Sequence, residues 1–239
     1  MTAAQLLWHD SLPSTQDEAH RLAASGAEHG AAVAACLQTG GRGTRGRAWV
    51  SGSGGLWLSV VCRPGGSGAG TEVVGLRVGL ALAVLLERLL SPPHRVTLKW
   101  PNDLYLGDKK LGGILAEARW QGDVMGWMVV GVGINLQNEI PRELGPTATR
   151  LADVGASADA ASLAAPVVRA VAEATRDAAP LSAEEVAAFE SRDWLRGRAI
   201  SLPEPGIAEG ITAHGRLRVR GAQGKISEIM APVRLAGQA

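Results

Sequence analysis

Three of the chain's four lysines, Lys99, Lys109 and Lys110, lie within nineteen positions, although 20 of its 24 basic residues are arginine. This segment, residues 99–117, reads KWPNDLYLGDKKLGGILAE. A lysine ammonium is a compact charge with three donors and differs chemically from the planar arginine fork. The concentration of lysine in so arginine-rich a chain therefore predicts a chemical site in 99–117.

A second candidate segment is the glycine-rich loop predicted over residues 39–55, which contains GRGTRGR at 41–47. Glycine lets the backbone approach a ligand, and Arg42, Arg45 and Arg47 can each donate charge-assisted hydrogen bonds, worth about 1.5–3 kcal/mol, to phosphate oxygens. The loop is therefore interpreted as a mobile anion clamp for a nucleotide phosphate. An RNA-binding Arg/Gly segment, with Trp49 as its aromatic residue, and a flexible surface loop are the alternatives.

Two nucleotide-binding motifs are excluded at this loop. Residues 41–46 match GxGxxG, but the dinucleotide motif also needs a helix at its third glycine and an acidic residue about 20 positions on. Residues 48–55 read AWVSGSGG, which cannot start a helix, and 65–70 contain no carboxylate. A P-loop is excluded because no Gly-Lys-Ser/Thr closes the loop.

The composition is that of a soluble globular protein, with 46% hydrophobic and 20% charged residues in 239. A net charge of +1 provides no global field for nucleic acid or membrane. The sequence contains no run of 18 apolar residues, the length that a bilayer-spanning helix needs, and residues 1–5 lack the features of a signal peptide. We therefore expect a cytoplasmic protein without nucleic-acid or membrane partners.

Metal and thiol chemistry find no support. Cys36 and Cys62 lie within apolar, strand-like runs, which predicts buried free thiols. The five histidines have neither i,i+4 nor cysteine-partnered spacing, so no metal site is assigned to side chains.

The elements that must position these segments can be read from capping residues and periodicity. Ser14 and Thr15 predict a capped helix start, and a stronger helix signal begins at 71–72 and ends at Pro92. Buried strands are predicted at 31–37 and 56–61, with a flexible loop at 64–70. Four further strands joined by short turns predict an antiparallel meander, at 96–99, 104–106, 114–120 and 124–130.

The C-terminal half of the sequence has a different pattern of predicted elements. Helices are predicted at 162–177 and 182–196. Beyond them, short apolar-polar alternations predict a small separate β-barrel with strands at 199–202, 206–211, 216–219, 225–229 and 232–235.

Three segments, Gln38 with the loop to Trp49, residues 99–117 and GVGINL at 131–136, together resemble the biotin protein ligases. The resemblance extends from Ser14 to the C-terminal strands. It implies an α+β fold: a catalytic domain, 1–190, with a mixed or mainly antiparallel sheet related to class II aminoacyl-tRNA synthetases, and an Src-homology-3-like β-barrel at 191–239. Because thirteen residues precede Ser14, we expect a monofunctional enzyme without an N-terminal DNA-binding domain.

The resemblance also implies a two-step acyl transfer. ATP converts biotin to biotinoyl-AMP with loss of pyrophosphate, assisted by Mg²⁺, and a lysine of a biotin carboxyl carrier protein, such as an acetyl-CoA carboxylase subunit, then displaces AMP. A homodimer is left open. The alternatives are a lipoate-protein ligase, which would share fold and chemistry, and a non-catalytic biotin-binding or regulatory module.

The resemblance also implies a role for individual residues, according to their positions in the motifs. Lys110 would hold the biotin carboxylate and then an α-phosphate oxygen, Arg42 would close over the adenylate, and Asp103 would orient the acceptor amine and accept its proton. The implied biotin-contacting residues are Ser14, Thr15, Gln16, Gln38, Arg42, Gly43, Thr44, Lys110 and Gly113. The implied ATP-contacting residues are Arg42, Arg45, Arg47, Trp49, Lys99, Asn102 and Asn135.

Some positions depart from the family pattern or stay ambiguous. Thr44 stands where the family usually has arginine, so the hold on the adenylate should be weaker unless Arg45 or Arg47 replaces that arginine. Gln16 stands where the family has asparagine. Trp49 could stack on adenine or only anchor the loop. Glu117 could support the site or face solvent, and Lys109 is interpreted as a turn residue.

Overall fold

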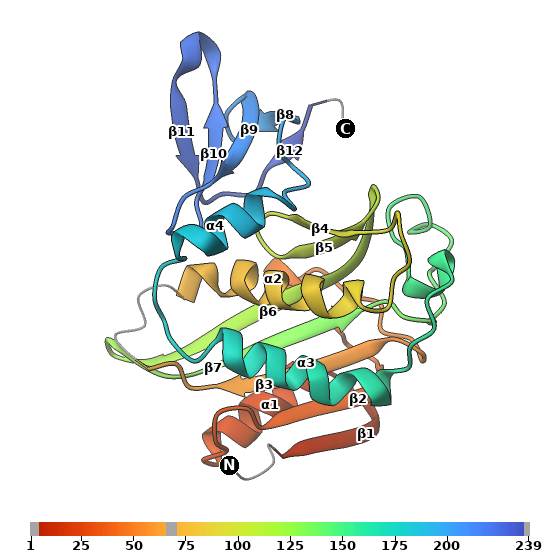
Figure 1. The fold of residues 1–239 in the computed structure, drawn as a ribbon. Coiled ribbons are helices and arrows are strands. Elements are labelled where there is room, and N and C mark those ends of the chain that lie inside the picture. Colours follow the sequence, from red (N-terminus) through yellow and green to blue (C-terminus); the bar gives the residue numbers. More distant parts are fainter. Residues whose placement is uncertain (1–4, 66–70, 237–239) are drawn as a thin grey trace.

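A seven-stranded mixed sheet is the larger of two sheets in a computed structural model that describes residues 5–65 and 71–236 (Figure 1). Its spatial order is β1-β2-β3-β7-β6-β5-β4. β1 and β2 are parallel and all other neighbours are antiparallel, which confirms the predicted meander as β4 to β7. The strands are β1 (Leu6–Leu12), β2 (Ala32–Gln38), β3 (Leu56–Cys62), β4 (Val96–Lys99), β5 (Asp103–Leu106), β6 (Lys109–Gln121) and β7 (Val124–Ile134).

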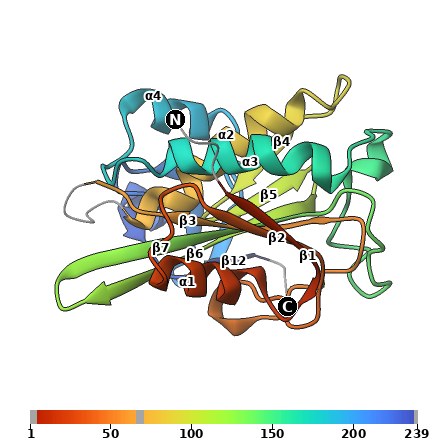
Figure 2. The same ribbon diagram turned by 90° about the horizontal axis from the view of Figure 1, so that it is seen from below.

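Helices cover both faces of this sheet (Figure 2). On one face α2 (Val74–Glu87) and α3 (Ala160–Ala174) pack over the main hydrophobic core, and α1 (Thr15–Ala24) lies on the opposite face. The Ser14 hydroxyl caps α1 by accepting from the Gln16 N–H, as the sequence predicts. Among the described residues, each helix is too short or too polar to cross a bilayer.

Several expectations about local structure differ from the structure. The sequence analysis predicts no strand at β1, because this segment becomes a strand through parallel pairing with β2. β6 begins at Lys109 instead of 114, since residues 109–113 pair with β5. α2 ends at Glu87, where the side chain accepts from the Val96 N–H, and not at Pro92. Lys109 is therefore the first residue of a strand and not part of the turn.

The helix predicted at 182–196 is shorter, and α4 spans Ala183–Glu190. The chain leaves the helix because its backbone pairs with β4: Leu98 N–H donates to Arg192 O and Trp194 N–H donates to Leu98 O, both at 2.9 Å. The other error concerns Cys36, which is exposed because β2 pairs with β3 only as far as Ala35. Cys62 is buried as predicted, and burial raises the pKa of its thiol to about 12.

A second, five-stranded antiparallel sheet follows α4, at the C-terminal end of the chain (Figure 1). Its strands have the order β11-β10-β9-β8-β12. The Trp100 indole N–H donates to Gly215 O at 2.8 Å and links the two sheets. The loop predicted at 64–70 lies largely outside the described residues. The strands are β8 (Ala199–Leu202), β9 (Gly206–Ile211), β10 (Leu217–Arg220), β11 (Ile226–Ile229) and β12 (Arg234–Leu235).

Leu82→Ala should test the packing of α2 on the sheet. Leu82 is fully buried, so its truncation leaves a cavity and should lower the free energy of unfolding by about 2–5 kcal/mol. Val84, on the same helix, is 50% exposed, and Val84→Ala should change it by less than about 0.5 kcal/mol. Urea unfolding measures both variants, and equal effects would contradict the assigned core face.

Candidate functional site

A cavity of about 360 Å³ lies between the start of α1, the loop 39–55 and strands β5 to β7. It brings together every site residue predicted from the sequence except Arg45, which is exposed on the loop. The predicted residues that line it are Ser14, Thr15, Gln16, Gln38, Arg42, Gly43, Thr44, Arg47, Trp49, Lys99, Asn102, Asp103, Lys110, Gly113 and Asn135.

Two glycines of β7 allow other segments to lie against this strand. A Cβ at Gly131 would lie 2.7 Å from Gln16 Oε1, and one at Gly133 would lie 2.7 Å from Trp49 Nε1. Any side chain at either position would displace these groups. The intervening Val132 is buried in the main core. One face of β7 therefore supports the fold while the other receives α1 and the loop.

A buried network of uncharged groups forms one end of the cavity. Thr15 donates through its N–H and its hydroxyl to Gln38 Oε1, at 2.8 and 3.0 Å. Gln38 Nε2 donates to Ser51 Oγ at 2.8 Å. Ser59 Oγ donates to Gln16 Oε1 at 2.9 Å. Such a wall suits a neutral ligand group that both donates and accepts hydrogen bonds.

Gln16 fits the position where the family pattern has a shorter asparagine. Its Nε2 reaches Val129 O at 3.1 Å and Leu115 O at 3.4 Å, on the neighbouring strands β7 and β6. Ser59 was missed by sequence reasoning because an isolated serine in an apolar strand carries no signal of a site.

Lys110 and Asp103 form an ion pair within the cavity, with Nζ and Oδ1 2.6 Å apart. They come together because Lys110 lies opposite Tyr105 in the β5–β6 pairing, beside a register shift at Leu104/Tyr105. The Lys110 ammonium also lies 5.0 Å from the ring centroid of Trp49. An anionic ligand group entering here would meet a fixed ammonium whose counterion is a carboxylate.

Lys99 lies among aromatic rings, and its Nζ donates to Tyr105 Oη at 3.2 Å. The same Nζ is 5.0 Å from the ring centroid of Trp194. The Trp194 ring packs against that of Tyr105, with centroids 4.7 Å apart and the planes tilted by 42°. Burial lowers the pKa of the Lys99 ammonium and raises that of the Tyr105 hydroxyl to about 12. Sequence reasoning missed Trp194 because it lies far from the motif along the chain.

Asn102 and Asn135 use their amides to shape the cavity walls. Asn102 Nδ2 donates to Ile114 O at 2.6 Å, and Asn135 Nδ2 donates to Thr149 O at 3.0 Å. Asn138 Nδ2 donates to Asn135 Oδ1 at 3.1 Å. In this arrangement both predicted nucleotide-side residues organise backbone that surrounds the cavity.

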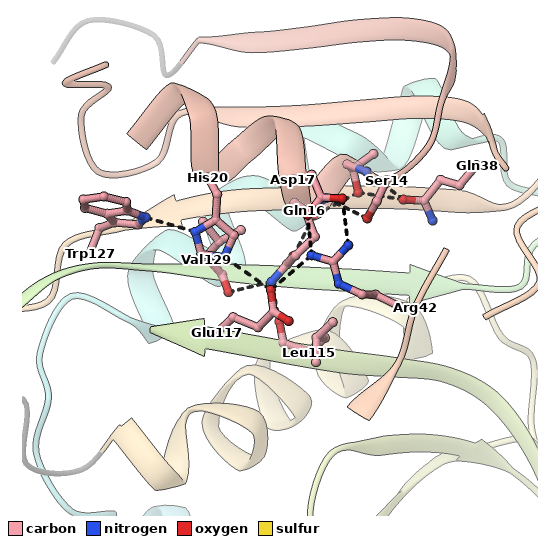
Figure 3. A network of polar contacts seen from close by, with 12 residues as sticks. Ser14, Gln16, Asp17, His20, Gln38, Arg42, Leu115, Glu117, Trp127 and Val129 are labelled. Carbon is pink, nitrogen blue, oxygen red and sulfur yellow. Dashed lines mark hydrogen bonds and ion pairs between the residues drawn. The ribbon is translucent and has the colours of Figure 1, made fainter. Parts of the chain in front are cut away.

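Arg42 is held by carboxylates from two elements (Figure 3). Its Nη1 and Nη2 donate to the two oxygens of Asp17 at 2.8 and 2.6 Å, and Nη2 lies 3.5 Å from Glu117 Oε2. His20 Nε2 lies 3.3 Å from the same Glu117 oxygen, and Trp127 Nε1 donates to His20 Nδ1 at 3.0 Å. Because the indole only donates, Nδ1 accepts and Nε2 carries the proton given to Glu117.

These contacts resolve the ambiguity at Glu117, whose carboxylate is a partner of Arg42. The His20 hydrogen bond is the main cause that lowers the pKa of Glu117 to about 2. The Arg42 ion pair lowers the pKa of Asp17 as well. Sequence reasoning missed Asp17 and His20, which read there as ordinary residues of a capped helix.

The loop folds back on itself as a hairpin over the cavity. Arg42 and Ala48 form an antiparallel bridge, and Gly43 N–H donates to Arg47 O at 2.7 Å. Arg47 Nη2 donates to Thr44 Oγ1 at 3.2 Å. Trp49 packs edge-on against Trp57, with ring centroids 6.5 Å apart, so it anchors the loop and also lines the cavity. A structured hairpin favours the clamp over a flexible surface loop.

Comparisons with known proteins identify relatives of this chain. Residues 8–135 match the Biotin/lipoate A/B protein ligase family. The Bifunctional ligase/repressor BirA of Bacillus subtilis is 37% identical over 150 residues, 61% of this chain and 46% of that protein. The chain thus spans about half the length of this relative. The Biotin--[acetyl-CoA-carboxylase] ligase of Mycobacterium tuberculosis is 33% identical over 228 residues, 85% of this chain and 79% of that protein.

Solved structures resemble the whole chain. The biotin protein ligase from Aquifex aeolicus in complex with biotin and ATP superposes with a TM-score of 0.80 at 29% identity, covering 97% of this chain and 99% of that one. The ligase from Leishmania major in complex with biotinyl-5-AMP has a TM-score of 0.63 at 25% identity, covering 95% and 99%.

Glu117→Gln should make the free energy of unfolding less dependent on pH in the acidic range. With the pKa of Glu117 lowered from 4.5 to about 2, the folded protein binds fewer protons than the unfolded chain, so stability rises with pH across this interval. The free energy of unfolding of the wild type should exceed that of the variant at neutral pH. This difference should shrink as the pH falls from 4.5 towards 2, as measured by urea titrations. A difference independent of pH would contradict the assignment.

Proposed function

Because this chain belongs to the Biotin/lipoate A/B protein ligase family, we propose that it is an ATP-dependent biotin protein ligase that modifies a biotin carboxyl carrier protein. One observation carries the proposal: a single cavity is lined both by the uncharged hydrogen-bonding side chains Thr15, Gln16 and Gln38 and by the cations Lys110, Lys99 and Arg42. Biotin has a neutral ureido ring at one end and a carboxylate at the other. ATP supplies phosphates to the cationic side.

In the first step, an oxygen of the biotin carboxylate attacks the α-phosphorus of ATP. The bond from phosphorus to the β-phosphate bridging oxygen breaks, and pyrophosphate leaves with that electron pair. Thr15, Gln38 and the residues around them would hold the ureido ring. Lys110 would stay bonded to the oxygens on which charge gathers, so that it stabilises the transition state more than the ground state.

In the second step, the amine of a carrier lysine attacks the acyl carbon of biotinoyl-AMP, and AMP leaves with the electrons of the broken C–O bond. A free lysine with a pKa of about 10.4 is mostly protonated at pH 7, and its deprotonation costs about 4.6 kcal/mol. Asp103, 2.6 Å from Lys110, is the carboxylate that would orient this amine and accept its proton.

Mg²⁺ would enter with ATP as part of the substrate. Among the described residues there is no cluster of three or more His, Cys, Asp or Glu that could hold a metal ion. Mg²⁺ in nucleotide sites is commonly bound through substrate phosphates and one or two carboxylates.

The architecture of the proposed enzyme is a catalytic domain, 1–190, of the kind related to class II aminoacyl-tRNA synthetases, followed by an Src-homology-3-like barrel at 191–239. The five short antiparallel strands after α4 support the second unit. The mixed sheet with helices on both faces supports the first.

Lys110→Ala should reduce biotin adenylation by about 10²–10³-fold, the usual effect of removing one donor that stabilises charge in the transition state. The protein is incubated with MgATP, biotin and a carrier domain, with pyrophosphate release and carrier mass as readouts. Lys109→Ala is the matched control, because Lys109 is exposed and donates to Gly145 O, and it should keep wild-type activity. No mass increase with the wild type would refute the proposal, and an increase with lipoate alone would favour a lipoate ligase.

Thr44→Arg should slow the release of biotinoyl-AMP. Thr44 is neutral and contacts Arg47 within the hairpin, so an added guanidinium at this cavity-lining position would strengthen the hold on the adenylate phosphate. The dissociation rate is measured by trapping released adenylate. Ser53→Arg adds the same charge to an exposed position of the loop and should leave the rate unchanged. Equal rates for Thr44→Arg and wild type would contradict the prediction.

A further inference from the structure

Asp17 and Glu117 touch Arg42 from outside the cavity. Arg42 is one of the described residues that line the cavity, whereas Asp17 and Glu117 are not. Asp17 projects from the first turn of α1 and Glu117 from β6, and their carboxylates converge on one guanidinium (Figure 3). Arg42 is therefore the cavity-lining residue that both carboxylates contact.

Arg42 is a member of the hairpin at 41–49 that covers the cavity. The hairpin is tied internally by Trp49 N–H to Gly41 O at 2.8 Å and by Gly43 N–H to Arg47 O at 2.7 Å. Its side chains contact the body of the protein through the Arg42 ion pairs and through the packing of Trp49 against Lys110 and Trp57. Fixing Arg42 thus fixes the first arm of the hairpin.

The carboxylates themselves are held in place. Asp17 accepts two hydrogen bonds from Arg42, which fixes the orientation of the guanidinium. A single hydrogen bond would allow the guanidinium to rotate. Glu117 is steered by His20, which in turn accepts from Trp127 on β7. These contacts connect β7 to the hairpin through His20 and Glu117. The position of Arg42 is therefore set by side chains of α1, β6 and β7.

We propose that Asp17 and Glu117 are positioning residues that form a catch on Arg42, keeping the 41–49 hairpin closed over the cavity. The consequence for catalysis, slower escape of the acyl-adenylate, rests on the proposed function. The catch itself does not, because every contact that forms it lies within this chain. It also compensates for the neutral Thr44, whose hydroxyl contacts Arg47 within the hairpin.

Limited trypsin digestion of the ligand-free protein tests the catch directly. Arg45 and Arg47 are exposed, and cleavage after them requires the hairpin to open. Asp17→Asn and Glu117→Gln should each raise the rate of cleavage at these two sites by up to about fivefold, the upper range for a partly exposed ion pair. Asp17→Glu retains the charge and should restore slow cleavage.

Glu18→Gln is the matched control, because it removes a carboxylate from the same helix turn, where Glu18 pairs with Arg21 and not with the hairpin. It should be cleaved as slowly as the wild type. Thermal unfolding measured in parallel separates hairpin opening from global loss of stability. Wild-type cleavage rates in Asp17→Asn and Glu117→Gln, or an equal increase in Glu18→Gln, would overturn the catch.

The second readout is the rate at which biotinoyl-AMP leaves the protein, which should rise in Asp17→Asn and recover in Asp17→Glu. Faster cleavage without faster release would overturn the role in retaining the adenylate. If the wild type formed no adenylate, the proposed function would fail, while the trypsin rates would still decide whether the catch exists.

Discussion

The absence of side chains at Gly131 and Gly133 is the constraint on which the site depends. Both glycines face the same side of β7, and at each the space of a Cβ is occupied by a group from another segment, Gln16 or Trp49. The helix that supplies the uncharged end of the cavity and the hairpin that covers it therefore meet on one strand. The opposite face of the same strand, through Val130 and Val132, remains part of the main core.

The three cations Lys110, Arg42 and Lys99 each have partners within the chain. Lys110 is paired with Asp103, Arg42 with Asp17 and Glu117, and Lys99 lies among aromatic rings where burial lowers the pKa of its ammonium. Each cation is thus held in a defined position by groups of this chain. Under the proposed function, an anionic substrate would replace or join an existing partner of each cation, and the site would be preorganised in this sense.

Much of the fold could be predicted because its elements follow local rules. The cap at Ser14, the apolar face of α2 and the alternating strands of the meander are properties of short windows of sequence. The errors arise where long-range pairing decides. β1 is a strand because β2 lies beside it, α4 stops because Trp194 pairs with Leu98, and Cys36 is exposed because the partner strand ends before it.

For the site, the sequence by itself determined the chemistry: the lysines of 99–117, the arginines of the loop and the polar residues near Ser14 are fixed by residue type and by their order in the chain. It could not determine how their charges are shared. Asp17 and Arg42, or Tyr105 and Trp194, are partners only after α1, the hairpin and the segment that follows α4 pack on the sheet. Electrostatic and stacking interactions act over a few ångströms in space whatever the separation along the chain, so only the tertiary structure decided which cation each carboxylate or ring would hold.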